Sequence, residues 1–88
     1  MTNDQLNPYT AFNTNEAFGL LDTIVAHSEH KDQLDDLDIS FLGIVAGLLE
    51  INDEVEVVIR FPKYLEQATK SEYLERYCVV PDIDSHNN

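Results

Sequence analysis

A near-continuous apolar run from Ile39 to Leu49 constrains the fold of this 88-residue chain more than any other feature. On a helix, these side chains would cover most of the circumference, and such a helix has to be covered on several sides. The run is about half of the ~20 residues that a membrane-spanning helix needs. We therefore expect residues 39–51 to form the central helix of one soluble domain.

Helical signals also lie on both sides of this run. An apolar stripe at spacings of three and four predicts a helix from residue 14 to about residue 30, with Thr14 as a suitable N-cap. Pro62 suits the first turn of a further helix, and Ser71 can cap a last helix over residues 72–78. The predicted fold is all-α, a compact single-domain bundle of four to five short helices.

The stretch 55–61 is the main ambiguity. Its valines and isoleucine favour a strand. Asp53 and Glu56, three residues apart, resemble a capping box and favour a short helix that ends before Pro62. A single strand would also have no partner in an otherwise helical chain. We predict a helix here, and a strand in an α+β fold is the alternative.

The chain divides into three parts by composition. Residues 1–13 read as an irregular N-terminal arm that Tyr9 and Phe12 could fix to the body, residues 14–80 as the helical domain, and residues 81–88 as a flexible polar tail. The single cysteine, Cys78, excludes an intrachain disulfide, and the first residues lack the pattern of a signal peptide. We expect a cytoplasmic protein.

Charge is the strongest indication of function. Seventeen acidic residues face five basic ones, for a net charge of -12. An acidic protein is repelled by nucleic-acid phosphates and by anionic membranes, so we expect neither as a direct partner. A basic protein that binds or cuts nucleic acid is the more natural partner.

Most of the excess charge lies in the middle third of the sequence, in two groups on either side of the apolar run. If the run is a helix, the groups lie roughly 18–20 Å apart at about 1.5 Å per residue, and could imitate several phosphates of one DNA strand. The alternative is that these acids have no binding function. They would then form a solvated surface, and some of them, Asp38 and Asp53 among them, would cap helices. The candidate partner-binding residues are Glu29, Asp32, Asp35, Asp36, Asp38, Glu50, Asp53, Glu54 and Glu56.

These features predict a small non-enzymatic inhibitor or immunity-type protein. It would occupy the basic surface of its partner, as a DNA mimic of phage or mobile-element origin does. No motif in the chain identifies a family, so the prediction rests on protein class.

The alternative is a helical adaptor or assembly subunit that binds a partner, or a second copy of itself, through an apolar helix face. Gly43 and Gly47, four residues apart, would let another backbone approach closely. Aromatic and basic residues near the end of the chain form a second patch of the types favoured in binding hot spots. The alternative partner-binding residues are Gly43, Gly47, Tyr64, Tyr73, Arg76 and Tyr77.

Catalytic and metal-binding signals are weak. His27 and His30 have a spacing that can share a metal on a helix, but no third ligand lies nearby in sequence. Asp82, Asp84 and His86 lack a glycine-turned calcium loop. The chain has no phosphate-binding loop and no nucleophile elbow. We predict no metal, no cofactor and no enzymatic activity.

Overall fold

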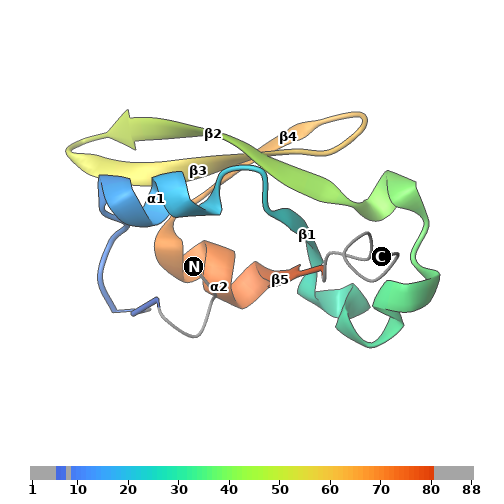
Figure 1. The fold of residues 1–88 in the computed structure, drawn as a ribbon. Helices are drawn as coiled ribbons and strands as arrows, with labels where there is room; N and C mark the ends of the chain where they lie inside the picture. Colours follow the sequence, from blue (N-terminus) through green and yellow to red (C-terminus); the bar gives the residue numbers. More distant parts are fainter. Residues whose placement is uncertain (1–5, 8, 81–88) are drawn as a thin grey trace, which may run out of the picture.

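A five-stranded antiparallel sheet organises the part of the chain that the computed structural model describes, residues 6–7 and 9–80 (Figure 1). The strand order is β4-β3-β2-β1-β5. In chain order, the elements are α1 (Thr14–Leu20), β1 (Ile24–His27), the 3-10 segments η2 (Ser28–Asp36) and η3 (Ile39–Phe41), β2 (Gly43–Ile51), β3 (Glu54–Arg60), β4 (Leu65–Ala68), α2 (Lys70–Arg76) and β5 (Tyr77–Val79). The predicted all-α bundle is therefore wrong.

The apolar run forms the central strand β2 instead of a central helix. A two-residue turn joins β2 to β3, because Ile51 pairs with Glu54 and the turn residues Asn52 and Asp53 have φ values of 52° and 67°. Positive φ at both central residues is the geometry of a type I′ hairpin turn, which matches the twist of antiparallel strands. Residues 55–61 thus lie mostly in the strand β3, and the run itself is the partner that this strand lacked in the helical prediction.

Both α-helices begin where the local signals indicated, or within a few residues of it. Asn13 caps α1, since its side chain accepts from the Glu16 amide at 2.8 Å while the Glu16 carboxylate accepts from the Asn13 amide at 3.0 Å. Thr69 and Glu72 form the same capping box at α2. Such local side-chain bonds satisfy amides that a helix start leaves free.

The helix ends were predicted wrongly. The first helix stops at Leu20 instead of near residue 30, because Asp22 adopts a φ of 68° and turns the chain into β1. The helix expected after Pro62 is absent, and a bend leads to the strand β4. The last helix ends at Arg76, so Cys78 lies in β5.

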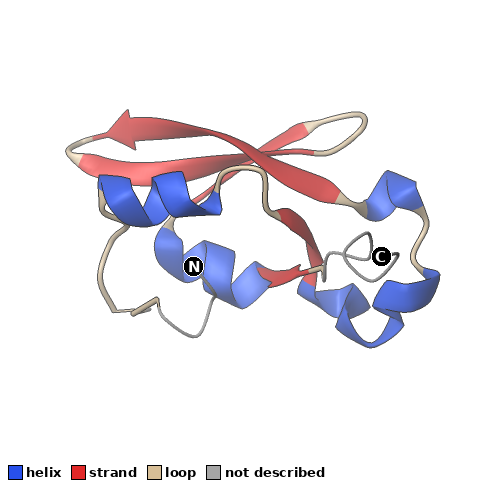
Figure 2. Ribbon diagram, viewed as in Figure 1, coloured by secondary structure: helices blue, strands red, loops and turns tan. Residues whose placement is uncertain are grey.

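The core lies between the helices and one face of the sheet. Figure 2 shows α1 and α2 on the same side of β2, β3 and β4. The inward residues of the strands alternate, and the buried core residues include Ala17, Leu20, Val25, Val45, Val57, Ile59, Phe61, Ala68 and Tyr73. Alternation of this kind is what a sheet covered on one face requires.

The arm before α1 is fixed by one of its two expected anchors. Phe12 is buried and forms an isolated bridge with Val55, whereas Tyr9 is 93% exposed. The predicted tail, with Asp82, Asp84 and His86, lies outside the described residues. Within the part of the chain that the structure describes, no helix is long and apolar enough to cross a membrane.

Candidate partner-binding site

The connection between β1 and β2 is far longer than its position requires. The two strands are adjacent and antiparallel, yet residues 28–42 join them, about 15 residues where a hairpin needs about two to five. We call residues 28–42 the acidic connection. Long connections in a small domain are commonly functional, because a shorter loop would build the same fold.

The acidic connection is held to the body at a few points only. The 3-10 segment η2 contains no buried residue, and its backbone breaks from helical geometry at Gln33. The Ser28 hydroxyl donates to the Glu75 carbonyl at 3.1 Å. Leu34 and Leu37 are half-buried. The carboxylates of this segment therefore face solvent.

Within the described residues, the acids of the connection form no ion pair with a lysine or an arginine. Glu29, Asp32, Asp35, Asp36 and Asp38 are all exposed, and within the described residues none lies within 4 Å of a lysine or arginine nitrogen. Glu29 lies 3.8 Å from the His30 ring. The Ser40 amide donates to Asp38 at 2.8 Å, and this hydrogen bond lowers the pKa of the Asp38 carboxyl. Several negative charges thus gather on one irregular segment.

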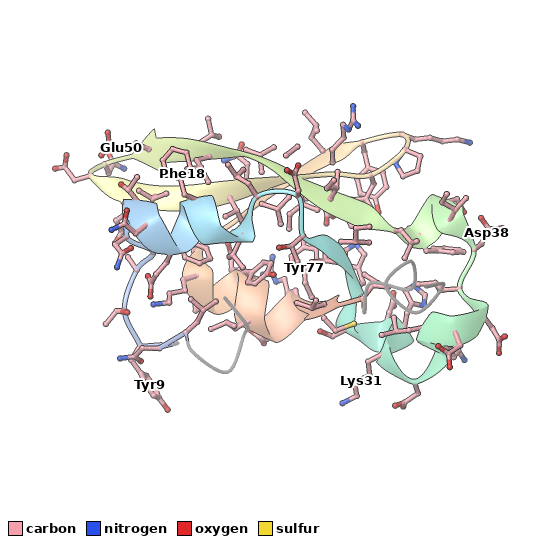
Figure 3. All side chains as sticks on the ribbon, in the orientation of Figure 1. Tyr9, Phe18, Lys31, Asp38, Glu50 and Tyr77 are labelled. Atoms are coloured by element: carbon pink, nitrogen blue, oxygen red, sulfur yellow. The ribbon has the colours of Figure 1, made fainter. Side chains whose placement is uncertain are left out.

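The second acidic group lies at the other end of the domain. Figure 3 shows Asp38 and Glu50 at opposite ends of the molecule. Glu50, Asp53 and Glu54 surround the turn between β2 and β3 and are exposed, and Glu56 is half-buried. Because β2 is a strand that rises about 3.3 Å per residue, its nine residues separate the groups by roughly 30 Å. The expected spacing of a helix was wrong.

The alternative binding residues do not form one surface. Gly43 is buried, and a Cβ there would lie 2.8 Å from the Phe61 ring, whereas Gly47 has open space around its Cα. Both glycines lie in the strand β2, so no helix face carries them.

The tyrosines and the arginine among these alternative binding residues are also divided between the core and the surface. Tyr73 and Tyr77 belong to the core. Tyr64 and Arg76 are exposed. The Tyr64 ring stacks on Phe61 at 4.8 Å, and Arg76 pairs with Glu72 at 3.5 Å.

A polar cluster that the sequence did not indicate joins the two edges of the sheet. Glu66 in β4 accepts from the Tyr77 hydroxyl at 2.5 Å, and the His27 Nε2 lies 3.2 Å from the same oxygen. Burial and this hydrogen bond raise the pKa of Tyr77. His27 also stacks on Phe61 at 5.1 Å.

The cluster gathers residues from β1, β4 and β5, whose pairing is not local in sequence, so no spacing rule could have found it. It connects strands that lie at opposite edges of the sheet. His27 and His30 do not converge on a common site, since His30 packs against Phe41. Among the described residues, no group of three or more metal-ligating side chains gathers.

The class of protein that the fold defines is a small α+β domain with an antiparallel sheet, helices on one face and a long acidic connection. Comparisons with family models, with characterised proteins and with solved structures find no match to this chain.

Proposed function

We propose that this protein is a non-enzymatic inhibitor or immunity-type protein that binds the basic surface of a nucleic-acid-binding or nucleic-acid-cutting protein. The observation that carries the proposal is the acidic connection, residues 28–42, which is longer than the fold requires and presents unpaired carboxylates. Its proposed compartment is the cytoplasm, which suits a lone thiol. A phage or mobile-element origin, with the acids imitating phosphates, belongs to the same proposal.

The physical support is electrostatic. Exposed acids that outnumber the basic residues beside them repel one another, so they cost stability unless a positive partner faces them. The net charge of -12 would also speed encounter with a basic protein, and salt would weaken that effect. Because the hairpin group lies at the opposite end, we assign the primary contact to the acidic connection alone.

The test uses a panel of purified basic nucleases and DNA-binding proteins, with and without competing duplex DNA. The informative variant is Asp32→Asn/Asp35→Asn/Asp36→Asn in the connection. A matched control is Asp22→Asn/Glu54→Gln/Glu75→Gln, which removes three exposed acids outside the connection and leaves the same net charge. Titration calorimetry of each pair gives the dissociation constant and its salt dependence.

The proposal expects a panel member that binds the wild type, is displaced by DNA and binds the connection variant at least about tenfold more weakly, a loss of about 1.4 kcal/mol. The control variant should bind nearly as well as the wild type. Equal losses in the two variants would show attraction to net charge only and would contradict the proposal. So would a partner whose binding ignores both salt and DNA.

The second candidate function is an adaptor or assembly subunit. A separate observation favours it: the sheet face opposite the helices carries exposed apolar side chains. The contact would then be a sheet face in place of the helix face that the sequence suggested.

A further inference from the structure

The sheet carries an uncovered apolar face. On the side of the sheet opposite α1 and α2, Leu65 in β4 is 65% exposed, Ile24 in β1 43% and Leu49 in β2 40%. Within the described residues neither α1 nor α2 packs on this side (Figure 2). We call it the open face; its apolar residues are Ile24, Ile44, Leu49, Ile51, Val58 and Leu65. An exposed patch of this kind marks an interaction surface.

One row of β3 gives the open face a charge pattern. Glu54, Glu56, Val58 and Arg60 alternate along the strand, so all four point to the open face. Neither Glu56 nor Arg60 forms an ion pair with any described residue. The row thus has two acids at one end and a base at the other, and Val58 lies midway between Glu56 and Arg60.

We propose that the open face binds the open face of a second copy of this chain, through a twofold axis that lies between the sheets and crosses β3 at Val58. Such a rotation places Val58 on Val58 of the second copy and Glu56 opposite its Arg60. The reciprocal pair forms at the same time, because a twofold interface repeats every contact. The Glu56 and Arg60 positions are therefore complementary to themselves in charge.

The same rotation matches apolar residues on β2. In the sheet, Ile44 lies beside Arg60 and Leu49 lies beside Glu56. Since Glu56 and Arg60 exchange places across the axis, Leu49 of one copy meets Ile44 of the other. Apolar side chains of β2 therefore flank the two charge pairs on one side.

Residues at the ends and at the centre of the open face also fit this twofold arrangement. Two residues beyond Leu49, Ile51 would enter a hollow of about 510 Å³ at the far end of the second copy's face. At the centre, no atom of the described residues lies within 4 Å of a Cβ position at Gly47, so the two sheets can approach closely. The hollow is lined mainly by Ile24, Ile39, Leu42, Ile44, Arg60 and Pro62.

The charge pairs of this dimer lie on β3, outside the acidic connection, although Ile39 and Leu42 of the connection line the hollow. Substitutions at Glu56 and Arg60 therefore test the dimer apart from the proposed function. Sedimentation equilibrium of the full chain measures it, at about 0.15 M salt to screen the repulsion between two acidic copies. Arg60→Glu places acid opposite acid, and Glu56→Arg places base opposite base. Each should raise the dimer dissociation constant about tenfold or more, because the axis makes one substitution act twice.

The decisive experiments are those that restore the two charge pairs between Glu56 and Arg60. The double variant Glu56→Arg/Arg60→Glu swaps both charges and should dimerise like the wild type. A mixture of the two single variants should form heterodimers, since the Arg60→Glu chain then carries acids at positions 56 and 60 and the Glu56→Arg chain carries bases at the same two positions. Lys31→Glu and Glu75→Arg change the net charge by the same amounts away from the face and should leave dimerisation unchanged.

A wild-type chain that stays monomeric throughout the concentration range overturns the proposal. A dimer that is indifferent to both single substitutions also overturns it, because another surface would then form the contact. Circular dichroism of each single variant establishes that the sheet is intact. The rescue by mixing does not depend on that measurement, since an unfolded chain could not restore a twofold dimer.

Discussion

At the scale of single residues, the two glycines of β2 should respond differently to the addition of a side chain. A Cβ at Gly43 would lie 2.8 Å from the Phe61 ring and 2.9 Å from Ile59, both buried. Gly43→Ala should therefore destabilise the domain by about 1–3 kcal/mol, because a packed core cannot yield easily. Gly47→Ala enters open space and should be neutral or slightly stabilising, since glycine weakens a strand. Urea unfolding of both variants tests this contrast, and equal stability losses would contradict it.

The Lys70–Glu16 pair should make stability depend on pH. Lys70 is 2% exposed, and its Nζ lies 2.9 Å from the Glu16 carboxylate and 3.0 Å from the Thr10 hydroxyl. Hydrogen bonds from Lys70 and from the Asn13 amide lower the pKa of Glu16 below its usual 4.5. A lowered folded-state pKa contributes stability above the usual value, and that contribution is lost as the pH falls through the lowered one.

Glu16→Gln isolates this contribution. Glutamine can keep the bond from the Asn13 amide, but it leaves the buried ammonium without its counter-charge. We expect a loss of about 2–3 kcal/mol at neutral pH. The difference from wild type should shrink as the pH falls from about 6 to about 3, in urea titrations at several pH values. A difference that stays constant with pH would show that the pair does not act through charge.

At the scale of elements, the bond between Tyr77 and Glu66 connects the two edges of the sheet. Tyr77→Phe removes the donor and leaves the Glu66 carboxylate with the His27 ring only, so we expect a loss of about 1–2 kcal/mol. Tyr73→Phe is the matched control. The Tyr73 hydroxyl is buried without a hydrogen-bond partner among the described residues, and burial raises its pKa to about 12. Its removal should be neutral or stabilising by thermal unfolding; a larger loss there than at Tyr77 would refute the contrast.

The turn between β2 and β3 allows a stabilising change. Asp53 has a φ of 67°, a left-handed conformation that costs a residue other than glycine about 1 kcal/mol or more. Asp53→Gly creates the preferred Asn-Gly pair of a type I′ turn and removes one acid from a crowded group. We expect higher stability by about 0.5–1 kcal/mol in urea unfolding, despite the entropy of glycine. Asn52→Ala, at a φ of 52°, should destabilise the same turn.

The elements also show which parts of the fold the sequence could predict. The starts of α1 and α2 follow from capping residues within three positions, so local chemistry suffices. The strand β2 could not be predicted from local sequence, because its residues are apolar at nearly every position and fit a buried helix equally well. The Asn52-Asp53 pair was the available signal for a hairpin, but Asn and Asp are also favoured at helix N-caps.

At the scale of the whole molecule, the acidic residues could be placed on the surface from the sequence, but their arrangement could not. Exposure of Asp32, Asp35 and Asp36 follows from their chemistry. The distance between the two acidic groups depends on whether the residues between them form a helix or a strand. The Glu66 cluster and the open face also depend on which strands pair, and these pairings are not local in sequence. Neither could therefore be predicted before the sheet was known.

Charge connects stability to function in this chain. With a net charge of -12 and unpaired acids in the connection, the folded domain repels itself more than the expanded unfolded chain does. Asp32→Asn/Asp35→Asn/Asp36→Asn should therefore raise the midpoint of urea unfolding, most strongly at low salt, and lower the affinity for a basic partner. The same variant should thus gain stability and lose affinity, because acids that serve binding reduce the stability of the free domain. A connection variant that is no more stable than the wild type at low salt would mean that these carboxylates are already well solvated, and their repulsion would then give no support to a basic partner.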